Sequence, residues 1–410
     1  MVPVGSQCVA GSFLANQTQP CTSWIYENNN SIFSEFNLAC QEWKRTMVGT
    51  VHSAGVLSAL PITAFISDTF GRRLALVLTS VAPAFVGMGR AICKNYIVYL
   101  VLEYIEATVN AGIYSTAFIL ALEMVAVNRR VIGGNIISST FAVGQTIAAL
   151  IAWAVPYWRI YTFLIYSPSI LFVFYYCLIQ ESVRWLLSKG RKKEAAKIIF
   201  RAAAVNGRQL SPETVRILTG RSSADHPTLK VKSLRVEEKV EKSSYMQVVK
   251  SRTMLFRMCV CSFWWNSVTF IYYGLSLNSV ALGGNSYVNY ILTALVEIPG
   301  YCLSMITLDR FGRKSSIMTS FFVCGLSLVV LPLVSNSTLV IVLTMVGKMC
   351  ISMIFCSIYI YTIELFPTCL RHSLMATCSM VGRVGSIVAP QTPLLVRSVA
   401  ICFMSLLQGL

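Results

Sequence analysis

Three charged side chains stand inside long apolar stretches of this chain, where they could bind an ion. Glu103 and Glu106 lie three residues apart, so a helix would place both carboxylates on one face. Arg383 lies in another apolar stretch, near the end of the chain. Carboxylates would attract a cation, whereas a guanidinium binds a carboxylate through two parallel hydrogen bonds. A charge in mid-membrane costs about 2.5–3.5 kcal/mol to insert, which makes it a candidate binding residue. The alternative is that the three pair with neighbouring helices or with one another.

Aromatic and amide side chains could complete such a site. Trp265 and Tyr272 are seven residues apart and therefore share one face of a helix. Aromatic faces attract ammonium groups, by about 2 kcal/mol when the pair is desolvated. Tyr361 and Asn110 are further candidates for the lining, since both lie within apolar stretches. Aromatic side chains in such stretches usually contact lipid or other helices, so spacing alone leaves both interpretations open.

A second set of charges recurs in register. Asp68-Thr-Phe-Gly-Arg-Arg73 is followed 241 residues later by Asp309-Arg-Phe-Gly-Arg-Lys314, and two further charges recur at the same offset. The glycine permits a tight turn, and the acids and guanidinium groups can reach neighbouring helix ends. We expect ion pairs that hold one conformation and break as two bundles rock. The alternative is that the basic residues only anchor the topology. The expected network comprises Asp68, Arg72, Arg73, Glu123, Arg130, Glu181, Arg184, Asp309, Arg313, Lys314, Glu364 and Arg371.

The elements that position these residues must be membrane-spanning helices. Hydrophobic residues make up 55% of the 410 and charged residues 12%, against roughly 25% charged in a soluble domain. The mean hydropathy is +0.64. About 20 helical residues cross a hydrocarbon core, and open strands cannot satisfy their backbone in lipid. We therefore expect an all-α membrane protein with spans near 47–67, 74–92, 96–122, 131–155, 160–179, 255–277, 287–308, 315–334, 339–363 and 373–396.

The repeated motif divides the chain into two structurally equivalent halves. Two-half membrane proteins are most often transporters. We expect an outer segment (1–46), an N-terminal bundle (47–179), a basic connector (180–253) and a C-terminal bundle (254–410). The stretch that would match the opening helix of the second half is polar, so we expect the first helix of the first half to be missing from this sequence and the chain to be clipped at both ends.

The distribution of charge predicts which side of the membrane each loop faces. The net charge is +17, and residues 180–252 alone contribute +10, with 17 Lys or Arg against 7 Asp or Glu. Excess Lys and Arg mark the cytoplasmic side, so the connector is expected there and residues 1–46 outside. We expect a multi-pass protein of the plasma membrane that binds no nucleic acid. Glycosylation acceptor triplets on the expected outer side begin at Asn16, Asn29 and Asn336.

Several motifs together resemble one known family. They are Asp-x-x-Gly-Arg-Arg after the first span, Glu181-Ser-Val-Arg-Trp-Leu-Leu-Ser-Lys-Gly-Arg191, Glu364-Leu-Phe-Pro-Thr-Cys-Leu-Arg371 and Arg383-Val-Gly-Ser-Ile-Val-Ala-Pro390. This set resembles the organic ion transporters of the major facilitator superfamily, which include organic cation, organic anion and carnitine transporters. The resemblance covers about residues 40–393. It implies a major facilitator fold of twelve helices in two pseudo-symmetric bundles, here with the first helix missing and the last incomplete, and transport by alternating access.

The resemblance also bears on the substrate. Family members that handle anions or carnitine often have Arg at position 383, whereas cation carriers have an acid nearby. Position 103 is commonly basic in the family, and here it is Glu. Negative charge in one bundle and positive charge in the other suits a zwitterion such as carnitine. The family's aromatic positions match Trp265 and Tyr272, which strengthens their assignment to the lining.

We therefore expect a transporter of small organic cations or zwitterions. The alternatives are an organic anion transporter and a truncated isoform that does not transport. The expected partners are a small organic ion and the lipid bilayer, and the choice between a coupling ion (sodium or proton) and uncoupled flux stays open. The three histidines are far apart, and we find no metal-spaced cluster, nucleophile elbow or phosphate loop. An enzyme, a metal site, a cofactor and an ATP-driven pump are accordingly not expected.

Overall fold

The structure is a computed structural model. It describes residues 2–3, 13–14, 25–26, 29–39, 41–125, 130–210, 212, 215, 251–366 and 371–394. The described part is helical apart from two short strands, β1 (Val2–Pro3) and β2 (Phe13–Leu14), which pair antiparallel. This confirms the expected all-helical membrane class.

The first bundle begins after a single turn of helix. That turn is α1 (Ile32–Glu35). The elements of the bundle are α2 (Glu42–Phe70), α3 (Arg72–Ile92), α4 (Tyr96–Asn110), α5 (Gly112–Met124), α6 (Arg130–Ala154), α7 (Trp158–Tyr166), the 3₁₀ helix η2 (Ser167–Phe174) and α8 (Tyr175–Leu178). Two short helices follow, α9 (Val183–Ser188) and α10 (Lys192–Val205). Both belong to the segment that the sequence analysis assigns to the connector.

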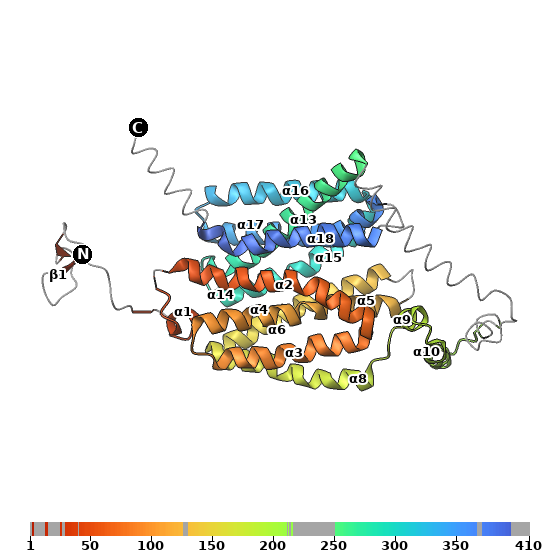
Figure 1. Ribbon diagram of the computed structural model, residues 1–410. Helices are drawn as coiled ribbons and strands as arrows, with labels where there is room; N and C mark the ends of the chain where they lie inside the picture. The colour runs from red at the N-terminus through yellow and green to blue at the C-terminus, as the bar shows by residue number, and fades with distance from the viewer. Residues whose placement is uncertain are drawn as a thin grey trace.

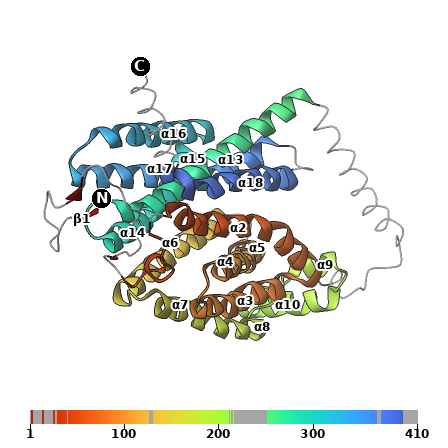
Figure 2. The same ribbon diagram turned by 60° about the vertical axis from the view of Figure 1, so that its left-hand side comes forward.

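The second bundle repeats this pattern. Its elements are α13 (Arg252–Asn278), η3 (Ser279–Ala281), α14 (Ser286–Leu295), α15 (Glu297–Arg310), α16 (Arg313–Val330), η4 (Leu331–Leu333), α17 (Ser337–Leu365), α18 (Arg371–Val388) and η5 (Ala389–Gln391). In Figures 1 and 2 the second bundle, green to blue, lies above the first, red to yellow, with their long helices running across the view.

Nine helical segments of the described chain are long and apolar enough to cross a membrane. They are Glu42–Phe70, Arg72–Ile92, Tyr96–Met124, Ile132–Ala154, Trp158–Leu178, Arg252–Ala281, Ser286–Arg310, Arg313–Leu333 and Ser337–Thr362. They match nine of the ten expected spans. The tenth expected span, 373–396, overlaps α18, which begins at Arg371 and ends at Val388 because a 3₁₀ turn with Pro390 follows.

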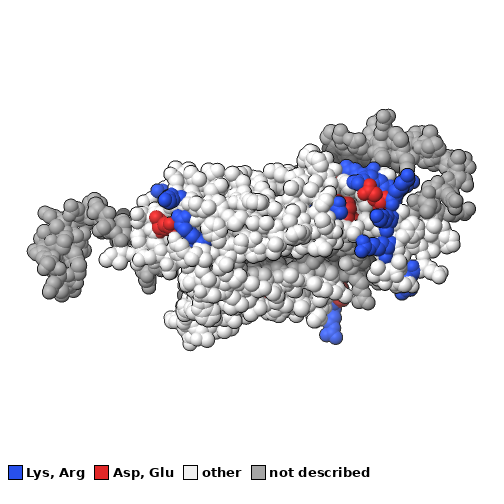
Figure 3. Space-filling model, turned by 90° about the horizontal axis from the view of Figure 1, so that it is seen from below, with Lys and Arg blue, Asp and Glu red and all other residues white. Residues whose placement is uncertain are grey.

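The two ends of the bundles differ in character. The charged-loop end carries Asp68, Glu181, Asp309 and Glu364, and α9 and α10 lie across it, on the right in Figure 1. The opposite end carries Asn95, Asn285 and Asn336, whose side chains cap the N-termini of α4, α14 and α17. On the face drawn in Figure 3, Lys, Arg, Asp and Glu gather toward the two ends and leave the middle uncharged. This pattern fits a hydrocarbon layer around the middle of the helices.

Glycines bring two equivalent helix pairs into backbone contact. A Cβ atom on Gly55 of α2 would lie 2.7 Å from the carbonyl oxygen of Tyr104 in α4. A Cβ atom on Gly300 of α15 would lie 2.7 Å from the carbonyl oxygen of Met349 in α17. Both residues of this second contact follow those of the first by 245 residues, not by the 241 of the loop motifs. The offset between the two halves is therefore not constant. From the glycine contact to the charged-loop end, α2 and the α4–α5 segment of the first bundle are each about one helical turn longer than α15 and α17 of the second.

The two bundles contact one another mainly through α2 with α18 and through α6 with α14 and α15. At the opposite end the Thr46 hydroxyl donates to Gln391 (3.0 Å), and the Gln391 amide donates to the Thr50 hydroxyl (2.7 Å). The rings of Trp153 and Tyr287 stack there with their centroids 6.3 Å apart. Polar and aromatic contacts thus join the bundles at the opposite end.

Candidate functional site

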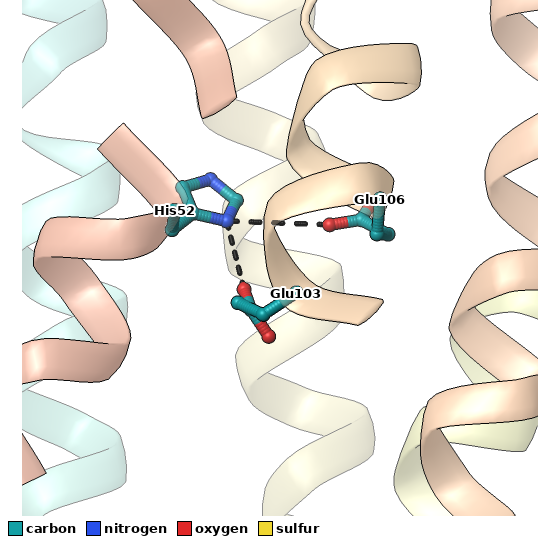
Figure 4. Close-up of side chains that lie close together, drawn as sticks. All are labelled: His52, Glu103 and Glu106. Atoms are coloured by element: carbon teal, nitrogen blue, oxygen red, sulfur yellow. Dashed lines mark hydrogen bonds and ion pairs between the residues drawn. The ribbon is translucent and has the colours of Figure 1, made fainter. Parts of the chain in front are cut away.

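The two predicted acids lie in a charged cluster within the first bundle. Glu103 and Glu106 are 5% and 0% exposed and project from α4 toward α2 and α3. His52 Nδ1 of α2 lies 2.8 Å from Glu103 Oε1 and 4.0 Å from Glu106 Oε2, as Figure 4 shows. The Arg90 guanidinium of α3 hydrogen-bonds to Glu103 and lies 3.9 Å from Glu106 Oε2. Both acids are therefore paired with charged side chains of neighbouring helices, which is one of the two alternatives that the sequence left open.

The cluster is completed by an amide and two phenol rings. The Asn110 amide donates to Glu106 Oε1 (3.0 Å), so this predicted lining residue serves the cluster. The Arg90 guanidinium lies 5.7 Å from the ring centre of Tyr99 and 5.5 Å from that of Tyr166. Glu106 Oε2 is buried and accepts no hydrogen bond from the residues that the structure describes. One carboxylate oxygen of the cluster thus lacks a donor.

A metal ion does not suit this cluster. His52, Glu103 and Glu106 bring three donor atoms within 4.8 Å of one another. The Arg90 guanidinium already contacts the carboxylates, and its positive charge would repel a divalent ion. We therefore assign no metal to the cluster.

Arg383 lies where the two bundles meet. Its Nη1 atom donates to the Tyr273 hydroxyl (3.3 Å), and its other electrostatic neighbours are Tyr359 of α17 and Tyr114 of α5 in the first bundle. Its buried Nε has no hydrogen-bond acceptor among the described residues, and no described carboxylate pairs with it. A buried guanidinium without a carboxylate is costly, so it favours a ligand that supplies one.

The predicted aromatic residues occupy the core of the second bundle. Trp265 is buried, donates its indole N–H to the Thr362 hydroxyl (3.1 Å) and meets Tyr359 edge to face at 4.5 Å. Tyr272 is also buried and donates to the Glu297 carboxylate (2.9 Å). Tyr361 is half-buried and lies 5.8 Å from the Trp264 ring. Their role in a substrate lining stays a prediction, because the polar atoms of Trp265 and Tyr272 already have protein partners.

Sequence reasoning missed a buried ion pair in the second bundle. Lys348 Nζ of α17 lies 2.9 Å from Glu297 Oε1 of α15, and both side chains are 0% exposed. Lys348 also donates to the Ser276 hydroxyl (2.7 Å) and lies 3.3 Å from the ring centre of Tyr272. Tyr301 donates to the same carboxylate (2.9 Å). The signal was present, since both charges fall inside expected spans. His52 and Arg90, inside expected spans as well, were missed in the same way.

The first charged-loop network is assembled around Arg72. Its guanidinium lies 2.9 Å from Asp68 and 3.8 Å from Glu123, and it donates to the carbonyl of Ser67 (3.0 Å). The Glu181 carboxylate accepts the backbone N–H groups of Arg72 and Arg73 (3.0 and 3.2 Å) and thereby caps α3.

Two basic residues beside this network are placed differently. The Arg73 guanidinium lies 4.3 Å from the ring centre of Tyr176 rather than beside an acid. Arg184 is exposed, without an ion pair among the described residues. The roles of Arg73 and Arg184 as ion-pair partners therefore stay predictions.

The second network is looser. Arg313 lies 3.2 Å from Glu364 and 4.0 Å from Asp309, and all three side chains are considerably exposed. Lys314 is exposed and has no ion pair within the described part of the chain. The side chains of Arg130 and Arg371 lie outside the described residues. Each of these ion pairs stays within one bundle, so the rocking lock remains a prediction.

The outer segment docks onto the opposite end of the first bundle. The Glu35 carboxylate accepts hydrogen bonds from Arg159 Nε (2.8 Å) and from the Trp158 indole (2.5 Å). The Arg159 hydrogen bond lowers the pKa of Glu35 below its ordinary value, and the Trp158 bond adds to this effect. Of the expected glycosylation sites, Asn29 and Asn336 are exposed, whereas Asn16 lies outside the described residues.

Comparisons with known proteins address the family directly. Residues 12–403 match the family described as "Sugar (and other) transporter". The chain is 33% identical to the organic cation transporter protein of Drosophila melanogaster over 93% of its length and 70% of that protein's. It is 30% identical to human solute carrier family 22 member 13, over 93% of its length and 67% of that protein's. For rat solute carrier family 22 member 3 the identity is 28%, over 90% of this chain and 65% of that one.

A solved structure shows the same fold. The xylose transporter XylE from E. coli, in a partially occluded inward open conformation, aligns with a TM-score of 0.64 at 14% identity and covers 89% of this chain and 84% of its own. These similarities, together with the two bundles and the expected spans, identify a membrane transporter rather than an enzyme. The chain belongs to the sugar (and other) transporter family of the major facilitator superfamily, with relatives among the organic cation transporters of solute carrier family 22.

Proposed function

We propose that this chain carries small organic ions across the plasma membrane by alternating access, and that its substrates are organic cations or zwitterions such as carnitine. Relatives over most of the chain are named organic cation transporters, which supports the charge of the substrate. The chain spans 65–70% of the length of such relatives, so their whole activity comes to it as a proposal.

One observation carries the zwitterion assignment. The Arg383 guanidinium lies at the bundle interface with tyrosine hydroxyls as neighbours, and its buried Nε lacks an acceptor among the described residues. A substrate carboxylate would pair with it and supply the missing acceptor. The rings of Tyr114, Tyr273 and Tyr359 beside Arg383 would attract an ammonium group by cation–π attraction. An organic anion, the second candidate, would use Arg383 in the same way but would have no use for the negative charge around Glu106.

The bundle contacts support alternating access. We propose that the charged-loop end faces the cytoplasm, because Lys and Arg are concentrated there. The contacts of Thr46, Thr50 and Trp153 with the second bundle would then close the outer end. Opening that end requires these contacts to break, while Arg72 and Arg313 hold the loop geometry within each bundle.

The test is tracer uptake into cells that express the chain. Radiolabelled carnitine, tetraethylammonium and benzoate are compared for the wild type, Arg383→Ala and Arg383→Lys, each normalised to surface protein. Removing one partner of a buried pair costs about 3–5 kcal/mol, so Arg383→Ala should reduce carnitine and benzoate uptake far more than tetraethylammonium uptake. Arg383→Lys should restore part of it, and Arg208→Ala, an exposed arginine on the connector, is the matched control.

The outcomes separate the candidates. Carnitine uptake without benzoate uptake supports the zwitterion assignment, and benzoate uptake alone supports an anion carrier. Unchanged carnitine uptake by Arg383→Ala contradicts the role of Arg383. A wild-type chain at the cell surface that takes up none of the three probes contradicts the proposed carrier function.

A further inference from the structure

We propose that His52, Arg90, Glu103 and Glu106 form a binding site for one proton, and that this proton is coupled to transport. The proposal rests on the proposed function and deepens it. A titratable cluster buried in a membrane bundle is a candidate proton relay when its charges do not balance without a proton.

The cluster has one negative charge too many. Glu103 and Glu106 bring two carboxylates, against which stands the single guanidinium of Arg90. With a neutral imidazole at His52 the net charge is −1 in a buried place, which is costly. One proton, on His52 or on Glu106, makes the cluster neutral. The two positions are adjacent, because His52 Nδ1 lies 4.0 Å from Glu106 Oε2.

Glu106 Oε2 is the atom that would take the proton, because it lacks a hydrogen-bond donor in the described part of the chain. Glu106 is 0% exposed, its Oε1 accepts from Asn110, and its Oε2 has no hydrogen bond of normal geometry among the described residues, although the Tyr166 hydroxyl is a further neighbour of this carboxylate. A buried carboxylate oxygen without a donor costs about 1–3 kcal/mol, more for a charged group. A proton on Oε2 would remove the charge and let the oxygen donate instead. Figure 4 shows this oxygen directed at the imidazole.

The second bundle provides the internal contrast. By the glycine contacts, Glu297 and Lys348 occupy the positions of His52 and Glu103. They form a balanced pair whose Lys348 ammonium has Glu297 and Ser276 as partners and whose carboxylate accepts from Tyr272 and Tyr301. The equivalent of Glu106 in this register is the apolar Ile351. Only the first bundle, of the two described clusters, therefore needs a proton for neutrality.

One residue of the cluster is accessible from outside the bundle. The His52 side chain is 44% exposed, whereas Glu103 and Glu106 are enclosed. Its titratable and charged neighbours are Glu103 and Glu106 of α4 and Arg90 of α3, with Tyr99 and Tyr166 behind Arg90. From the second bundle, α18 contacts α2 and carries Arg383, whose guanidinium is held at Tyr273. His52 can thus take a proton from water and pass it to Glu106.

The charge balance predicts the direction of coupling. A proton and the positive group of a substrate compete for the same excess negative charge. Binding of an organic cation from one side therefore expels the proton, and cation entry drives proton exit. The proton is transferred from the carboxyl or imidazolium group to water, with no other bond made or broken.

The first experiment measures proton movement in proteoliposomes. The purified chain is reconstituted with a pH-sensitive dye inside, the membrane potential is clamped, and tetraethylammonium is added outside with or without sodium. We expect the lumen to become more alkaline as the tracer enters, independently of sodium. Glu106→Gln should reduce the number of protons moved per tracer to zero, and Glu194→Gln, the same change at an exposed position of α10, should leave it unchanged.

The second experiment does not depend on transport. Infrared difference spectra of the purified chain between acid and alkaline pH should contain the band of a protonated carboxyl group that is absent in Glu106→Gln. Should that variant not fold, His52→Gln serves instead and should displace the pH at which the band appears. Loss of transport with the band present contradicts the proposed function and leaves the proton site standing. Sodium-driven uptake without proton movement, or the same band in Glu106→Gln, overturns the proton site.

Discussion

Lys348 and Glu297 form a fully buried ion pair, 2.9 Å apart, at the positions that Glu103 and His52 hold in the first bundle. The sign of the charge is exchanged between the copies. In the first bundle the acid lies on α4 and the base on α2, whereas in the second the base lies on α17 and the acid on α15. What the two halves share is therefore a charged contact beside a glycine crossing, not its polarity.

Breaking this ion pair should lower the free energy of unfolding of the second bundle. Lys348→Met leaves the Glu297 carboxylate buried without its cation, which costs about 3–5 kcal/mol. Lys348→Met combined with Glu297→Gln removes both charges and should recover most of that loss. The midpoint of thermal unfolding in detergent measures both, and a double variant no more stable than the single one would contradict the pairing argument.

The glycine crossings predict a second pattern of stability. Gly55→Ala and Gly300→Ala place a methyl group 2.7 Å from a carbonyl oxygen of the neighbouring helix, so each should cost about 1–3 kcal/mol. Gly144→Ala and Gly325→Ala are matched controls, because a Cβ atom there meets nothing within 4 Å. These should be neutral or stabilising by about 0.5–1 kcal/mol. Equal effects at all four positions would refute the close crossings.

The docking of α1 should weaken in acid. The pKa of Glu35 is lowered in the folded chain, chiefly by the Arg159 hydrogen bond, from an ordinary value of 4.5. A lowered pKa contributes stability that is present above pH 4.5 and is lost as the pH falls below it. Amide hydrogen exchange in residues 32–35 should therefore accelerate below pH 4.5, after correction for the intrinsic rate. Glu35→Gln should exchange fast at every pH, and an unchanged profile in that variant would exclude the carboxylate as the cause.

A cross-link at the opposite end should stop the transport cycle. A Cβ atom on Gly49 of the first bundle would lie 2.9 Å from the Cβ atom of Pro390 in the second, so cysteines at these two positions are close enough to be joined by oxidation. If the bundles separate there during each cycle, oxidation should abolish tracer uptake and a reductant should restore it. The two single-cysteine variants are the controls, and full uptake by the cross-linked protein would disprove movement at this end.

Much of the fold could be predicted from the sequence. Hydropathy and helix length suffice for spans, and the loop motif reveals the duplication. The same rule of mid-span charge that selected Glu103 and Arg383 also applies to Glu297 and Lys348, which lie in the expected spans 287–308 and 339–363. Their positions in the sequence therefore suffice to mark Glu297 and Lys348 as candidates.

The partners of these charges could not be predicted in the same way. Whether Glu103 faces Arg90, His52 or an open cavity depends on which helices touch and at what height, and hydropathy carries no information on either. The loop motifs carry no information on the height of these contacts either. Their offset of 241 residues aligns the charged-loop end, whereas the glycine crossings align at 245.

That difference of one turn makes the duplicated halves unequal in length along the membrane normal. Four helical residues rise about 6 Å, so an ion travelling between the bundles meets the charges of one half before those of the other. The free-energy profile of the ion along this path is then asymmetric. Uptake and release of one and the same solute should therefore differ in half-saturating concentration and in maximal rate, while the ratio of these two quantities stays equal in both directions, because the equilibrium across a symmetric membrane is unchanged.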